Sequence, residues 1–130
     1  MTIAETQKAA PFFKFENLRI YHKSLQFSEA ILAIYDHAVT DSDRMVAKLY
    51  FEAACSITNN IIEGSSVAKC VFVDYLQKAK SGIRECVTYT AILHDRKVID
   101  EEQLTDIRNE LIELTKMAGA LIVSLQNENN

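Results

Sequence analysis

The sequence from Ala53 to Cys86 reads AACSITNNIIEGSSVAKCVFVDYLQKAKSGIREC, and it decides how the chain folds. Apolar residues recur every three or four positions on both sides of residues 63–66 (Glu-Gly-Ser-Ser), which predicts two helices joined by a tight connection. Asn60 falls on the apolar stripe of the first of these helices. A buried amide needs a hydrogen-bond partner, so we expect Asn60 to be buried and bonded to the connection or to polar groups of the second helix. This favours a structural role over a ligand site.

Amphipathic patterns outside this stretch predict a single all-α domain. The expected helices cover about 16–37, 43–63, 68–94 and 101–126, between a flexible tail at 1–14 and a frayed tail at 127–130. The last helix carries a heptad seam, and Asp100 with Gln103 forms a capping box at its start. Only three Gly and one Pro argue against a turn-rich β-protein. We predict an antiparallel up-down-up-down four-helix bundle over residues 15–126.

The first helix has two apolar stripes on nearly opposite sides. The larger stripe, which we assign to the bundle core, is made of Leu18, Tyr21, Leu25, Leu32 and Tyr35. The second is made of Ile20, Phe27, Ile31 and Ile34. A helix packed on one side of a monomer does not need a second stripe, so we predict that these four residues form an oligomer interface. The alternative is a first helix that lies centrally in the bundle.

Composition restricts the class of protein and its location. The chain has 130 residues, a net charge of −4 and three cysteines, Cys55, Cys70 and Cys86, with neither disulfide-framework nor zinc-site spacing. No apolar run is long enough for a membrane span, and residues 1–14 lack the apolar core of a signal peptide. We therefore expect a cytoplasmic protein that does not bind membranes.

Motifs for catalysis are missing from the sequence. A di-iron bundle needs Glu-x-x-His on two helices, but the residues three before His22, His37 and His94 are Arg19, Ile34 and Ala91. There is no P-loop and no glycine-rich phosphate cradle. We predict that the protein is not an enzyme and needs neither a cofactor nor a metal.

Charge is spread unevenly between the last two helices, because the third is rich in basic residues and the fourth in acidic ones. Pairing between these neighbours, or two separately solvated faces, would explain the pattern without a ligand. Alternatively, Lys69, Lys80 and Arg84 lie within about 60° on the third helix and could contact the phosphates of RNA or DNA.

The stretch quoted above resembles a known family. The matching residues are Ser56 to Gly64, then Phe72, Tyr75, Leu76, residues 79–82 and Glu85, together with Phe15 to Leu18, Tyr21 and Lys23 near the N-terminus. They resemble the four-helix-bundle proteins encoded in intervening sequences of bacterial 23S rRNA genes, also called S23 ribosomal proteins. Within this motif we single out Ser56, Asn60, Glu63, Gly64, Ser81 and Glu85 as its structural residues.

The resemblance implies a left-handed four-helix bundle assembled as a homopentamer, without known catalytic activity. Distantly similar accessory proteins of diversity-generating retroelements form basic pentameric barrels, which suggests a nucleic-acid role. This chain departs from the pattern, with Ser65 and Ser66 where an aromatic and a basic residue are usual, and without the usual Phe-Pro between the first two helices. We expect a non-catalytic homo-oligomeric scaffold whose partners are further copies of itself, with another protein as a second candidate partner. The alternative is an RNA- or DNA-binding pentamer that uses the third helix.

Overall fold

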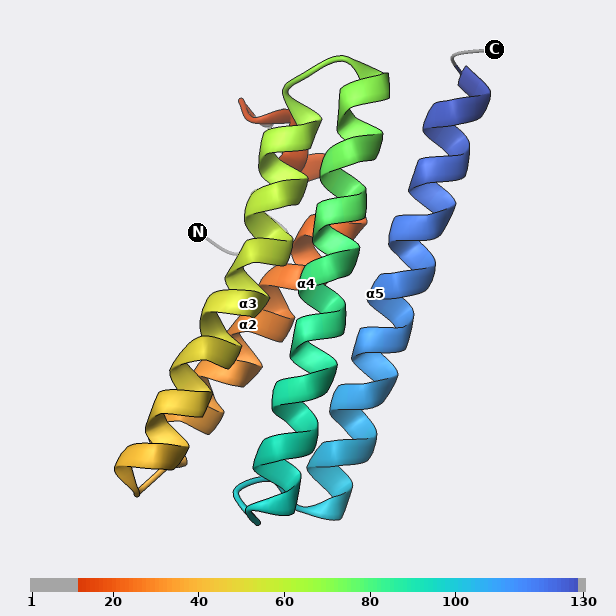
Figure 1. The fold of residues 1–130 in the computed structure, drawn as a ribbon. Coiled ribbons are helices and arrows are strands. Elements are labelled where there is room, and N and C mark those ends of the chain that lie inside the picture. The colour runs from red at the N-terminus through yellow and green to blue at the C-terminus, as the bar shows by residue number, and fades with distance from the viewer. Residues whose placement is uncertain (1–11, 129–130) are drawn as a thin grey trace.

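The chain forms four long helices that run alternately up and down (Figure 1). The structure is a computed structural model, and it describes residues 12–128. A short 3-10 helix, η1 (Lys14–Asn17), precedes α2 (Arg19–His37), α3 (Asp41–Ser65), α4 (Lys69–Asp95) and α5 (Glu101–Glu128). The described residues contain no strand, which confirms the predicted all-α bundle.

The helix boundaries differ from the expected ones only near the ends. The first long helix starts at Arg19 instead of near residue 16, because the chain from Lys14 to Asn17 is wound as a 3-10 turn and Leu18 is extended. The last helix continues to Glu128, two residues beyond the expected end. The predicted N-terminal tail falls mostly outside the described residues.

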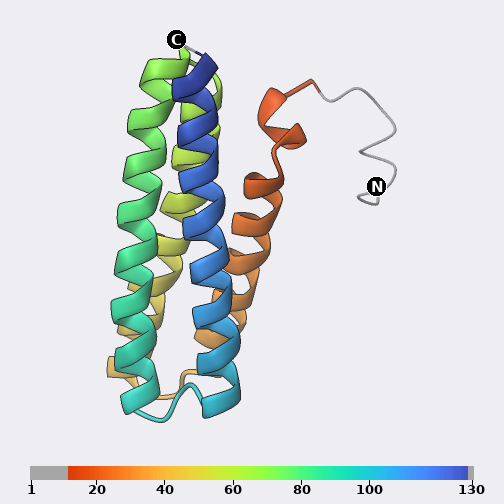
Figure 2. The ribbon, with the colours of Figure 1, turned by 90° about the vertical axis from the view of Figure 1, so that its right-hand side faces the viewer.

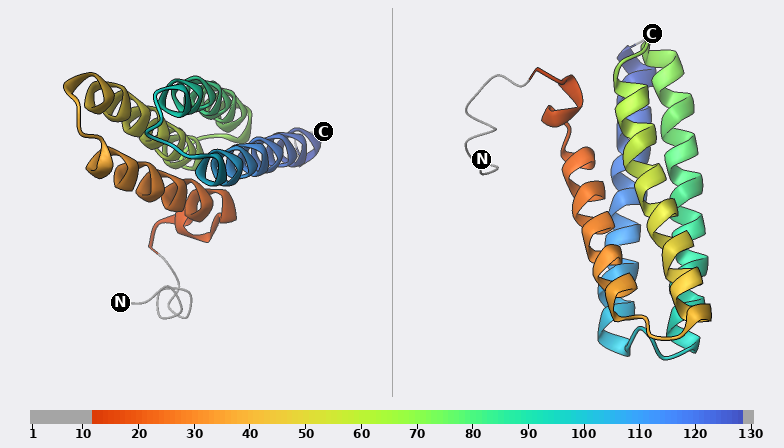
Figure 3. Two further views of the ribbon diagram at one scale, coloured as in Figure 1. Left: turned by 90° about the horizontal axis from the view of Figure 1, so that it is seen from below. Right: turned by 90° about the vertical axis from the view of Figure 1, so that its left-hand side faces the viewer.

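The four helices are not packed equally closely. Contacts are most extensive between α3 and α4, whereas α2 and α5 touch at few places. In Figure 2, α2 leans away from the other helices toward its N-terminal end. Seen along the bundle, α2 and α3 lie on one side and α4 and α5 on the other (Figure 3). The α3–α4 pair is therefore the firmest part of the molecule.

Two glycines allow this close approach of α3 and α4. A Cβ atom on Gly82 of α4 would lie 2.8 Å from the Ser56 hydroxyl oxygen and 3.0 Å from a side-chain carbon of Ile57. On Gly64 of α3, it would lie 2.5 Å from the Phe72 ring. Real Cβ atoms do not approach other heavy atoms so closely, so both sites need glycine.

Polar groups inside the core are hydrogen-bonded in short chains. The Thr90 hydroxyl donates to the Cys86 carbonyl (2.6 Å) and accepts a bond from the Tyr50 hydroxyl (2.6 Å), which joins α3 to α4. The Thr58 hydroxyl donates to Ser24 (2.9 Å) and so joins α3 to α2. Burial raises the pKa of Tyr50, which stays neutral. These bonds fix the rotation of the helices about their axes.

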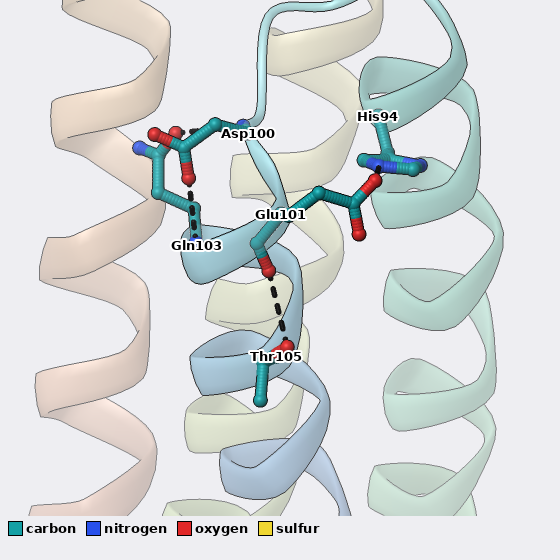
Figure 4. Close-up of polar contacts among 5 residues, drawn as sticks. All are labelled: His94, Asp100, Glu101, Gln103 and Thr105. Carbon is teal, nitrogen blue, oxygen red and sulfur yellow. Dashed lines mark hydrogen bonds and ion pairs between the residues drawn. The ribbon is translucent and has the colours of Figure 1, made fainter.

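The end of the bundle where α4 meets α5 is tied together by side chains. The predicted capping box is confirmed, since the Gln103 amide donates to the Asp100 carboxylate (2.8 Å) and the Asp100 amide donates to the Gln103 side chain (3.0 Å; Figure 4). His94 of α4 pairs with Glu101 at the start of α5 (2.7 Å; Figure 4). In the same turn, Lys97 adopts φ 65° and reverses the chain.

The second apolar stripe of the first helix lies in the core of the single chain and not on its surface. Side chains of this stripe are 0–6% exposed within the single chain and belong to its hydrophobic core; they are Ile20, Phe27, Ile31 and Ile34. The prediction that they form an oligomer interface is wrong, because the packing of α2 on α3 and α5 already buries them. Instead, Leu25 and Leu32 of the other stripe are 38% and 43% exposed. The two stripes therefore exchange roles, and an apolar row still faces outward.

Candidate interaction surfaces

The Asn60 amide is satisfied by its own helix. Its Nδ2 donates to the Ser56 carbonyl at 2.8 Å, and the side chain is only half-buried at the edge of the α3–α4 contact. Both parts of the prediction are wrong: Asn60 is not fully buried, and its partner is neither the connection nor α4. The physical reason is that an Asn side chain in a helix can reach the carbonyl four residues earlier.

The other motif residues serve the α3–α4 contact and the helix end. Ser56 lies against Gly82 and donates to the Ala53 carbonyl (2.6 Å), while Gly64 is buried against α4. The exposed Glu63 offers its carbonyl to the Ser66 hydroxyl (2.9 Å), which closes α3. The side chains of Ser81 and Glu85 are exposed on α4. The motif is thus a folding device, and these residues do not converge on a common site.

Of the three predicted nucleic-acid contacts, only two remain together. Lys69 pairs with Glu128 near the end of α5 (2.6 Å), which neutralises its charge. Arg84 is exposed and donates to the Ser81 hydroxyl (3.1 Å), and Lys80 lies one helical turn before it on the same flank. The flank of α4 alone therefore carries less free positive charge than the sequence predicts.

A groove of about 260 Å³ runs between α4 and α5 on the outside of the bundle. It is lined by Ile83, Arg84, Val87, Arg108, Leu111, Ile112, Thr115 and Lys116. Its floor is aliphatic, and Val87 and Ile112 remain 39% and 48% exposed. No carboxylate is among the lining residues. The groove therefore combines uncovered apolar surface with a positively charged rim.

The rim charges are not balanced within the chain. Among residues 12–128, the rim cations Arg84, Arg108 and Lys116 form no ion pair, and neither does Lys80, one turn before Arg84 outside the lining. The acidic residues of α5 are directed elsewhere: Glu113 pairs with Lys23 (3.2 Å) and Arg19 on α2. General pairing between the basic and the acidic helix is therefore not observed, although Lys69–Glu128 and His94–Glu101 link their ends.

A second uncovered surface is the outward row of α2. Leu25, Glu29, Leu32 and Asp36 follow one another at spacings of four, three and four residues, so they lie along one face of the helix. All four side chains are exposed. We call this row the α2 ridge. Arg44 beside it is engaged by Tyr35, with the guanidinium 5.1 Å from the ring centre.

Sequence reasoning missed the α5 half of the groove. Arg108, Ile112 and Lys116 are spaced by four residues, and this spacing was the available signal. It was hidden because the fourth helix is acidic on average. For the α2 ridge, Glu29 and Asp36 interrupt the leucine row, and this indicates a solvent-facing stripe.

Among the described residues there are free thiols but no cluster of metal ligands. No cluster of three His, Cys, Asp or Glu residues among them could hold a metal ion. The three cysteines are free thiols, and burial raises the pKa of Cys86 to about 12. None of the described helices is long and apolar enough to cross a lipid bilayer. The α4–α5 groove and the α2 ridge are the candidate interaction surfaces.

Comparison with known proteins places the chain among helical relatives. A family model described as "23S rRNA-intervening sequence protein" matches residues 16–120. A crystal structure of a protein with unknown function from the S23 ribosomal protein family of Bacteroides thetaiotaomicron VPI-5482 is similar, with a TM-score of 0.72 and 25% sequence identity. The match covers 79% of this chain and 97% of that one. Among curated proteins, no match was found.

Proposed function

Because the chain belongs to the 23S rRNA-intervening sequence protein family, we propose that it is a non-catalytic scaffold that associates with itself. The observation that carries this proposal is the exposed apolar row on α2. Leu25 and Leu32 are 38% and 43% exposed on the outside of a helix whose other side is fully buried. Ordered apolar rows of this kind mark contact surfaces in soluble proteins.

The composition of the groove supports a role without catalysis. Its lining has no carboxylate, imidazole or thiol that could act as acid, base or nucleophile. The Thr115 hydroxyl donates to the Leu111 carbonyl (2.8 Å) and is occupied in the helix. The three free thiols agree with a reducing cytoplasm, which we include in the proposal.

Self-association is tested by measuring the mass in solution. We expect light scattering at micromolar concentration to give a multiple of the 14.7 kDa chain mass, with five copies as the specific expectation. The variant Leu25→Ser/Leu32→Ser should shift the mass toward one chain, because it removes the apolar row without touching the core. The control Val39→Ser changes an exposed residue just after α2 and should leave the mass unchanged. A wild-type protein that is monomeric throughout would overturn the proposal.

RNA or DNA binding is the second candidate, and three cations without ion pairs along the groove (Arg84, Arg108 and Lys116), with Lys80 one turn from Arg84, favour it. An oligomer would repeat this surface and strengthen binding to a long strand. The test is a gel shift at several salt concentrations with wild type and Lys80→Glu/Arg84→Glu. Binding through phosphates predicts a shift at low salt that weakens with salt and is lost in the variant. The absence of any shift at low salt would exclude this candidate.

A further inference from the structure

We propose that the α4–α5 groove of one copy receives the α2 ridge of a second copy, so that copies associate head to tail. This inference rests on the proposed self-association and adds which two surfaces meet. It is carried by three observations: an apolar groove with an unbalanced positive rim, an apolar helix row with unpaired carboxylates, and the placement of the two on different sides of the bundle.

The groove has the composition expected of a helix-docking site. Val87 and Ile112 form an exposed aliphatic floor, and Arg108 and Lys116 stand on its α5 side without carboxylate partners among the described residues. An amphipathic helix that carries leucines would cover the floor. Carboxylates beside those leucines would meet the rim cations.

The α2 ridge supplies both chemical features. Its leucines alternate with Glu29 and Asp36, neither of which forms an ion pair within residues 12–128. From Leu25 to Asp36 the ridge extends about 16 Å along the helix axis at 1.5 Å per residue. From Arg108 to Lys116 the groove rim extends about 12 Å by the same measure. The ridge is therefore long enough to cover the groove rim, both surfaces are apolar, and their charges are opposite in sign.

A helix explains the groove better than a nucleic-acid strand does. Phosphates would satisfy the rim cations but would leave the aliphatic floor facing water or sugars. The floor also lacks an aromatic ring on which a base could stack. A leucine row removes Val87 and Ile112 from water, and the carboxylates beside it form ion pairs with the rim cations.

The location of the two surfaces determines the type of assembly. The ridge belongs to the α2–α3 side and the groove to the α4–α5 side of the bundle (Figure 3). A two-fold dimer joins the same surface of both copies, so it cannot fill both grooves when groove and ridge lie on different sides. Head-to-tail contacts fill every groove, and they close into a ring when the rotation per copy permits.

The test reverses the charges on each surface and then on both. Arg108→Glu/Lys116→Glu makes the groove rim acidic, and Glu29→Lys/Asp36→Lys makes the ridge basic. Either variant brings like charges together at the contact, so each should become monomeric. We expect association to weaken by about 100-fold or more, because like charges at an interface are strongly unfavourable. The fourfold variant restores opposite charges and should recover the wild-type mass. Lys78→Glu/Lys97→Glu is the control, since it changes the net charge equally at exposed residues outside the groove. Circular dichroism shows that each variant is folded.

Each outcome separates this inference from the proposed function. A monomeric wild type overturns self-association itself. If the wild type assembles and both reversed variants keep its mass, or the fourfold variant stays monomeric, the groove–ridge pairing is wrong while self-association stands. The inference is equally wrong if Arg108→Glu/Lys116→Glu abolishes an RNA gel shift but leaves the mass unchanged, because the cations then serve nucleic acid.

Discussion

At the scale of single residues, two mid-helix glycines have opposite surroundings. Gly82 is buried at the α3–α4 contact, where a Cβ atom would press on Ser56 and Ile57. A Cβ atom on Gly119 of α5 would meet nothing within 4 Å, so no other part of the described chain packs closely against this glycine. The same residue type is needed for packing at one site and only lowers helix propensity at the other.

Alanine substitutions should therefore act in opposite directions. Gly82→Ala should lower the free energy of unfolding by about 1–3 kcal/mol, because overpacking outweighs the gain in helix propensity. Gly119→Ala should raise it by up to about 1 kcal/mol, because only the propensity changes. Urea unfolding of both variants, compared at equal oligomer mass, provides the measurement. If Gly82→Ala is as stable as Gly119→Ala, the close α3–α4 contact is not as described.

At the scale of helices, the two ends of the bundle are closed by different interactions. Gly64 and the Glu63–Ser66 bond end α3 tightly before α4. At the other end, Arg96 after α4 pairs with Asp43 in the first turn of α3. The hydrogen bond from Arg96 holds the pKa of Asp43 below its usual value. This pair joins the start of α3 to the α4–α5 turn, far apart in sequence.

The Asp43–Arg96 pair makes stability depend on pH in a specific window. Because the folded-state pKa of Asp43 is lowered, its contribution is present above the unfolded value of 3.8 and is lost as the pH falls through the lowered folded value. Asp43→Asn should therefore be less stable than wild type at pH 7, and the difference should shrink toward pH 3. Urea unfolding at both pH values measures it. The control is Asp95→Asn, which changes an exposed carboxylate without an ion pair in the described chain. Its free energy of unfolding should differ little from that of the wild type at either pH.

At the scale of the whole molecule, α2 is attached less firmly than α3 and α4. It packs on α3 through its core stripe and the Ser24–Thr58 bond, but it touches α5 at few places. Its α5 contacts include the solvent-exposed ion pairs of Glu113, and such pairs contribute little to stability. Docking of the ridge into a second copy would hold α2 from its other side.

Hydrogen exchange should reveal this difference between helices. Under conditions that favour monomers, backbone amides in the middle of α2 should exchange faster than those in the middle of α3 and α4. At concentrations where copies assemble, exchange in α2 should slow more than exchange in α3. Equal protection of α2 and α4 in the monomer would contradict the uneven packing described here.

Much of the fold follows from local patterns in the sequence. The four helices and the Asp100–Gln103 capping box depend on residues close in sequence, and the structure confirms them. The break between the second and third helices is also present, but α3 continues to Ser65, two residues beyond the expected end at residue 63. The family was also predicted correctly from the motif that begins at Ser56, and the family model bears it out. Local spacing fixes these features because helix formation and capping involve neighbours within one or two turns.

The tertiary structure alone decided which surfaces are free. Both stripes of α2 are apolar, and only the packing of α2 on α3 and α5 shows that Ile20 and Phe27 are inside and Leu25 is outside. The groove joins Arg84 of α4 to Arg108 and Lys116 of α5, so neither helix reveals it by itself. The sequence determined the helices and their family, because these depend on local spacing. The interaction surfaces depend on how the helices rotate against one another, and long-range packing sets that rotation.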